Sequence, residues 1–209
     1  DTLDRIQAYI AASTPGRLPP PRGLEVPPEK RDPRSNFRFF ENRQKYLLFV
    51  HTCSEKRVIA ERVGLELASL HPRPPALRVF DAGVGDGTVL ARVMRWMHGR
   101  FPHMPFYIAG KELSLEDVRL TLDKVPDRMF EHPATVFVLT NMYYAEAPWL
   151  TPASPTAAAG MIWHEVALRG ASSGEFETQI AELGLFLEQN WRANISPKSG
   201  MPIYEPEAE

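Results

Sequence analysis

Glycine and carboxylate residues alternate in one short stretch of the sequence, Asp81-Ala-Gly83-Val-Gly85-Asp-Gly87. An apolar run precedes this stretch and a helical pattern follows it, so we place it at the turn between a strand and a helix. Ligands of open α/β sheets bind beyond the carboxyl ends of the strands, and glycines there let the backbone approach them closely. Asp81 disfavours a pyrophosphate at this turn and favours a ligand with an ammonium or sulfonium charge. We therefore predict a ligand-binding loop.

The spacing of the glycines separates two classes of cofactor. The dinucleotide fingerprint is G-x-G-x-x-G, and Thr88 stands where its third glycine would be. The phosphate-binding motif G-x-x-x-x-G-K-[ST] does not occur in the chain. A nicotinamide-dependent dehydrogenase is therefore the weaker alternative.

Strand and helix patterns alternate around this loop. Apolar runs predict strands at residues 77–83, 106–110, 135–140 and 158–164, and helical patterns predict helices at 38–50, 54–70, 87–100, 114–125 and from 176 to near 195. The apolar stripes of two of these helices are Ile59, Val63, Leu67 and Leu70, and Leu90, Val93, Met94 and Met97. Thr52-x-x-Glu55 matches a capping box, and Ser114 is the expected N-cap of the helix that follows it. This alternation predicts βαβ crossovers and a largely parallel sheet.

The segment from Asp81 to Gly87 resembles the first motif of the class I S-adenosylmethionine-dependent methyltransferases, and the resemblance extends over about residues 37–193. It implies an α/β fold with a Rossmann-like, mostly parallel sheet and helices on both faces. It also implies that Asp81, Gly83, Gly85 and Gly87 bind S-adenosylmethionine. The implied activity is the transfer of the sulfonium methyl group to a nucleophile.

The resemblance assigns roles to residues after the next two strands. Glu112 follows the second strand, where the family has an acidic residue that binds the ribose hydroxyls; the alternative is that Glu112 only begins the next helix. Asn141 stands where the family usually has an acid at the adenine, and Met142 is the apolar neighbour that packs the ring.

The fourth strand and the N-terminal helices carry the remaining implied roles. His164 and Glu165 end the fourth strand and are the candidate catalytic residues, with a polar rim residue and a turn cap as the alternatives. Tyr46 or Phe40 would cover the methionine end of the cofactor; an ordinary aromatic core is the alternative.

The 20 prolines divide the chain. Seven of them precede residue 35, and proline suits neither a helix interior nor a central strand. We therefore predict a Pro-rich arm with a short helix at residues 1–36, N-terminal helices at 37–72 and the cofactor-binding domain at 73–209. The family sheet has seven strands and the patterns place four, so we expect C-terminal strands of the fold to be missing from these 209 residues.

Charge and composition limit the classes of partner that this protein is expected to bind. The net charge is −2, with +4 in residues 1–62 and −6 in residues 63–209. We therefore expect a small-molecule acceptor and do not expect a nucleic-acid partner. The alternatives are a protein or nucleic acid docked by the basic arm and a non-catalytic binding scaffold of the same fold. No apolar run is long enough for a membrane helix, no metal-ligand spacing occurs, and the single Cys53 fits a cytoplasmic location. The oligomeric state stays open.

Overall fold

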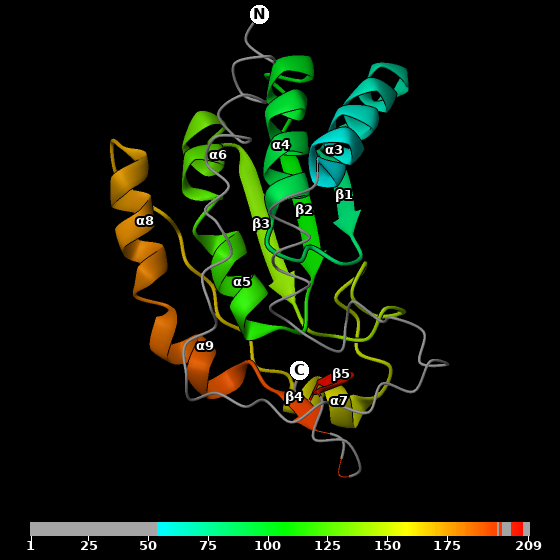
Figure 1. Cartoon of the computed structure of the whole chain (residues 1–209), viewed down its shortest axis with the longest axis vertical. Helices are drawn as coiled ribbons and strands as arrows, with labels where there is room; N and C mark the ends of the chain where they lie inside the picture. The colour runs from blue at the N-terminus through cyan, green and yellow to red at the C-terminus, as the bar shows by residue number, and fades with distance from the viewer. Residues whose placement is uncertain (1–53, 196, 198–201, 207–209) are drawn as a thin grey trace, which may run out of the picture. The chain divides into compact units, whose positions relative to one another are not determined.

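A computed structural model of the chain describes residues 54–195, 197 and 202–206 (Figure 1). The expected Pro-rich arm at residues 1–36, the helix at 38–50 and Tyr46 lie outside the described residues, as do Phe40 and Thr52. None of the helices in the described part of the chain is long and apolar enough to cross a membrane.

The central sheet has three parallel strands, as the alternating patterns predicted. They are β1 (Leu77–Asp81), β2 (Phe106–Lys111) and β3 (Thr135–Thr140), in the order β1-β2-β3. Leu77 pairs with Phe106, which pairs with Thr135. Because the strands are parallel, their carboxyl ends meet at one edge of the sheet, where the arrowheads lie in Figure 1. The residues that follow each strand are therefore brought together at this edge.

Helix α4 (Thr88–Arg100) packs on the sheet through the apolar stripe predicted for it. Leu90, Val93, Met94 and Met97 are all buried, and they form one core with Phe106 and Ile108 of β2. Alternate residues of the strands face the other way. On that side Arg78 lies over the rings of Tyr107 and Trp149, so the loop after β3 contributes to this second face. Helices were expected on both faces of the sheet. In the described residues, the hydrophobic core includes side chains of α3 (Glu55–Glu66), α4 and α6 (Pro126–Glu131) but none from a helix on this second face.

Helix α3 (Glu55–Glu66), with the 3₁₀ turn η2 (Leu67–Ser69), buries a different face from the one predicted. Of the expected stripe only Leu67 is buried, and Ile59 and Leu70 are exposed. The face that meets α4 carries Ala60 and Gly64 instead. A Cβ on Gly64 would lie 2.9 Å from the indole of Trp96, so the bulk of that ring selects small residues at the helix crossing.

Two helices lie between β2 and β3 where one was expected. Helix α5 (Leu115–Leu122) begins at the predicted N-cap, where Ser114 Oγ accepts a hydrogen bond from Asp117 N at 3.3 Å. Helix α6 (Pro126–Glu131) begins at the proline directly after the single helix expected at 114–125. A proline in the first turn is tolerated because the N–H it lacks would have no partner there.

The fourth strand, expected at residues 158–164, is not formed. Helix α7 (Pro155–Gly160) takes its first half, and residues 161–168 have no regular structure. Ser154 caps α7 by accepting a hydrogen bond from Ala157 N at 3.1 Å, and the alanines that follow favour a helix.

The C-terminal part differs from expectation in two further ways. The final helix is divided into α8 (Ser173–Ala181) and α9 (Gly184–Asn190), which pack on α6 and α5 respectively. Strands β4 (Ala193–Ile195) and β5 (Pro202–Pro206) then pair antiparallel in a separate sheet. Neither strand was predicted from the sequence, and neither extends the parallel sheet.

Candidate cofactor-binding site

The glycine loop between β1 and α4 is hydrogen-bonded at Val84 and Gly85 to the last residue of β2 and to the residue after it. Val84 N donates to Lys111 O at 3.0 Å, and Gly85 N donates to Glu112 Oε2 at 2.9 Å. The approach is close because the penultimate residue of β2 is a glycine: a Cβ on Gly110 would lie 2.4 Å from Val84 Cγ2. The sequence-predicted loop and the predicted ribose-binding residue are therefore neighbours in space.

The carboxylate of Glu112 organises the turn after β2. Its Oε1 accepts from Leu113 N at 2.7 Å and from Ser114 N at 2.9 Å, while Oε2 accepts from Gly85 N. Glu112 therefore has the alternative role predicted for it, at the start of the next helix, because the N–H groups of Leu113 and Ser114 lie just before α5. A carboxylate oxygen has two lone pairs, so Oε2 retains one for a further donor such as a hydroxyl.

Asp81, the last residue of β1, is a carboxylate with little compensation. Its Oδ1 accepts from Gly83 N at 3.2 Å, and no cation of the described residues pairs with it. Burial raises the pKa of Asp81, and the hydrogen bond from Gly83 only partly opposes the rise. A half-buried carboxylate with one hydrogen bond and no cation beside it is poorly compensated, and such groups cluster where a ligand supplies the missing partner.

Two glycines of the loop border open space. A Cβ added to Gly83 or to Gly85 would meet no atom within 4 Å. Gly85 also has a φ of +56°, which L side chains rarely adopt. Gly87 is different: its φ is +73°, and a Cβ there would lie 2.9 Å from the backbone of Thr121. Gly87 is therefore required by packing, while Gly83 and Gly85 leave room beside the loop.

Asp86 in the same loop was not identified from the sequence. Its carboxylate binds Lys56 Nζ at 2.5 Å and Thr88 Oγ1 at 2.8 Å, and Lys124 Nζ lies 3.7 Å away. Burial alone would raise the pKa of Asp86, but the hydrogen bonds from Lys56 and Thr88 and the charge of Lys124 lower it to about 2. Asp86 is thus an anion whose contacts hold the loop against α3, through Lys56, and against the turn after α5, through Lys124. Its partners lie 30 and 38 residues away, so no local pattern reports them.

The turn after β3 contains the predicted adenine-binding residues, and both are buried. Lys111 Nζ, itself buried, donates to the carbonyls of Asn141 at 3.2 Å and Met142 at 2.5 Å. The ring of Tyr144 lies 4.8 Å from the same ammonium group. Lys111 therefore fixes this turn to β2, a role the sequence analysis missed because the residue falls within a strand.

The candidate catalytic residues lie beside β3. His164 and Glu165 line a cavity of about 620 Å³ that Asn141 and Met142 also line, and His164 stacks on Phe186 of α9 with ring centroids 4.4 Å apart. Neither Asp81 nor the glycine loop borders this cavity. The structure thus groups His164 and Glu165 with the predicted adenine residues rather than with Asp81, and their catalytic role stays a prediction.

The candidate site therefore consists of two groups of residues, one at the carboxyl edge of the sheet and one beside β3. Asp81, the glycine loop and Glu112 form the first group, and Asn141, Met142, His164 and Glu165 the second. No protein-family model matches this chain, and no curated protein matches its sequence.

Proposed function

We propose that this protein is a Rossmann-like methyltransferase that binds S-adenosylmethionine at the glycine loop and acts on a small-molecule acceptor. The observation that carries the proposal is that the carboxylates of Asp81 and Glu112, from the ends of β1 and β2, both contact the glycine loop. Each accepts a hydrogen bond from a backbone N–H of that loop, at Gly83 and Gly85 respectively. Two carboxylates around an open glycine turn suit a cationic nucleoside and repel a pyrophosphate.

The residues present fit the cofactor. The uncompensated carboxylate of Asp81 suits its ammonium group, and Glu112 Oε2 has a lone pair for a ribose hydroxyl. Asn141 and Met142 would face the adenine from the turn after β3. The bound cofactor supplies a methyl group on a sulfonium, which a nucleophile displaces in line. The protein then acts by holding donor and acceptor in position and by excluding water.

The acceptor is proposed to be small because the cavity beside β3 has the size of a small-molecule site. Its volume of about 620 Å³ lies within the usual range for such sites, and its lining is largely apolar. His164 and Glu165 are the polar side chains that would orient or deprotonate an acceptor there. A cytoplasmic location is part of the same proposal and depends on the single Cys53.

A non-catalytic binding scaffold is the second candidate, and one observation favours it. His164 and Glu165 do not border the same space as Asp81, since residues 158–164 do not form the fourth strand. A single-turnover assay separates the two candidates. The enzyme transfers a methyl group to at least one member of a broad acceptor panel, whereas the scaffold binds the cofactor and transfers nothing.

The proposed cofactor site is tested by calorimetry with S-adenosylmethionine. We expect the unaltered chain to bind it with micromolar affinity. The variant Gly83→Leu should weaken binding at least about tenfold, because it fills the open space beside the loop without needing a positive φ. Gly160→Leu is the matched control: its Cβ also meets nothing within 4 Å, but it lies at the end of α7. Absence of binding by the unaltered chain, or equal binding by both variants, would exclude this site.

A further inference from the structure

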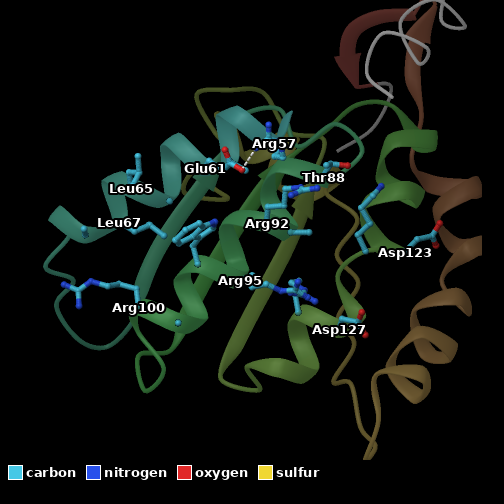
Figure 2. Close-up of a pocket in the computed structure, with 18 residues that line it drawn as sticks. Arg57, Glu61, Leu65, Leu67, Thr88, Arg92, Arg95, Arg100, Asp123 and Asp127 are labelled. Carbon is cyan, nitrogen blue, oxygen red and sulfur yellow. Dashed lines mark hydrogen bonds and ion pairs between the residues drawn. The ribbon is translucent and has the colours of Figure 1, made fainter. Parts of the chain in front are cut away.

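A second cavity lies on the opposite side of α4 from the sheet. A groove of about 1150 Å³ runs between α3, α4 and the turn that joins α5 to α6 (Figure 2). Its lining includes six basic residues and three acidic ones: Arg57, Arg92, Arg95, Arg100, Lys124 and Arg128, and Glu61, Asp123 and Asp127. The whole chain carries −2, so this groove concentrates positive charge that the composition does not reveal.

Most of these cations already have carboxylate partners. Arg57 binds Glu61 at 2.7 Å, and Arg95 and Arg128 both bind Glu131, at 3.3 and 2.7 Å. Within the described residues, Arg92 and Arg100 have no carboxylate partner, and Arg100 lies over the ring of Phe101. Figure 2 shows Asp123 and Asp127 at one side of the groove and Arg100 at the other. The uncompensated positive charge therefore lies along α4.

An exposed aromatic ring lies between these two arginines. Arg92, Trp96 and Arg100 follow one another at intervals of four residues, so they share one face of α4 and are about 6 Å apart along its axis. Trp96 is 49% exposed. Gly64 of α3 supports part of the indole, where a Cβ would lie 2.9 Å away. The ring is thus fixed from one side and accessible from the groove.

We propose that this groove binds a single strand of nucleic acid, with a base stacked on Trp96 and flanking phosphates on Arg92 and Arg100. Basic grooves with an aromatic stacking platform are the means by which proteins bind single strands without reading sequence. A duplex keeps its bases stacked on each other and cannot offer one to Trp96. An acidic peptide would use the arginines but has no need of the ring between them. The groove adjoins the glycine loop through Lys124, which donates to Asp86 O, but Arg92, Trp96 and Arg100 take no part in the proposed cofactor site and the proposal does not depend on it.

The test measures fluorescence anisotropy of a labelled single-stranded oligonucleotide with the full chain. We expect Arg92→Glu combined with Arg100→Glu to weaken binding at least about tenfold. The salt dependence should also fall: the slope of log K against log salt becomes shallower by about 1.4, since each phosphate contact on a single strand contributes about 0.7. The matched control is Arg73→Glu combined with Arg169→Glu, which makes the same charge change at exposed arginines outside the groove.

Trp96 is tested with Trp96→Leu, which keeps an apolar side chain against Gly64. It should weaken binding of the oligonucleotide but leave unchanged the binding of an abasic strand of the same length, because only the former has bases to stack. Thermal melting of each variant shows that it is folded, and cofactor binding is measured separately.

Three results would overturn the proposal. The first is that the unaltered chain does not bind the oligonucleotide, and the second is that the control pair weakens binding as much as Arg92→Glu combined with Arg100→Glu. The third is that polyglutamate competes as strongly as the oligonucleotide and that Trp96→Leu has no effect on binding. The last result would identify the groove as a site for acidic peptides.

Discussion

At the scale of single residues, the two acids of the candidate site differ in how their charge is compensated. Glu112 accepts three backbone hydrogen bonds. Asp81 accepts one, and its pKa is raised by burial. The folded protein therefore tolerates a charge at Asp81 that it does not stabilise. This is the pattern expected of a residue kept for binding a cation rather than for folding.

Asp81→Asn should stabilise the protein without ligand at neutral pH. A raised pKa in the folded state means that ionisation of Asp81 opposes folding at pH values above its unfolded pKa of about 3.9. The gain from the substitution should therefore shrink as the pH is lowered through the folded pKa and vanish below the unfolded one. Thermal melting of the variant and the unaltered chain across this range measures it.

The same substitution should weaken cofactor binding, so stability and affinity move in opposite directions. Asp123→Asn is the control, because Asp123 is exposed and lies outside the proposed cofactor site. If Asp81→Asn destabilises the protein at neutral pH, Asp81 has a structural partner and the interpretation of its charge is wrong.

At the scale of elements, the glycine loop is positioned by how closely it packs on β2. Gly110 has no side chain, and Val84 fills the space next to it. Gly110→Ala should cost about 1–3 kcal/mol of unfolding free energy, because its Cβ would lie 2.4 Å from Val84 Cγ2. It should also weaken cofactor binding by displacing the loop. Chemical denaturation and calorimetry measure the two effects.

The cause is checked by a double variant. Val84→Ala removes the clashing methyl group, so Gly110→Ala should cost less in the Val84→Ala background than in the unaltered chain. Gly99→Ala is the control within α4: a Cβ there meets nothing within 4 Å, and we expect a stability gain of about 0.5–1 kcal/mol. Equal costs of Gly110→Ala in both backgrounds would show that the clash with Val84 is not the cause.

At the scale of the whole molecule, Asp86 joins parts of the chain that no local pattern connects. Its carboxylate binds Lys56 of α3, and Lys124 Nζ, beyond α5, donates to its backbone carbonyl at 2.7 Å. The loop is thereby bound to helices on both sides of it. The charge of Asp86 is stabilised by these contacts, in contrast to that of Asp81.

Asp86→Asn should lower the free energy of unfolding at neutral pH by about 2 kcal/mol, the equivalent of a pKa lowered from 3.8 to about 2. Because the folded pKa is the lower one, this stability is present above about pH 4 and is lost as the pH falls through 2. The difference between variant and unaltered chain should therefore disappear on acidification. Denaturation at several pH values measures it.

Glu61→Gln is the matched control, since it removes an exposed ion pair with Arg57 and should cost less than about 1 kcal/mol. A difference for Asp86→Asn that is as large at pH 2 as at neutral pH would mean that its charge is not the source of the stability.

The sequence by itself determined the unit of β1, glycine loop, α4 and β2, with the four buried residues of the α4 stripe, and it identified Glu112 as a candidate site residue at the end of β2. These features depend on contacts between neighbours in the chain or on the rule that parallel strands end at one edge. The helix α6 and the loss of the fourth strand were missed because Pro126 and Ser154-Pro155 begin helices as readily as they end other elements.

Only the tertiary structure decided which side of α3 is buried, how the charge of Asp86 is compensated and where the arginines gather. The reason is the same in each case. Trp96 selects Gly64 from the opposite helix, and Lys56 and Lys124 reach Asp86 from 30 and 38 residues away. Contacts between residues so distant depend on how the helices pack, and the periodicity of one element carries no record of its neighbour's side chains.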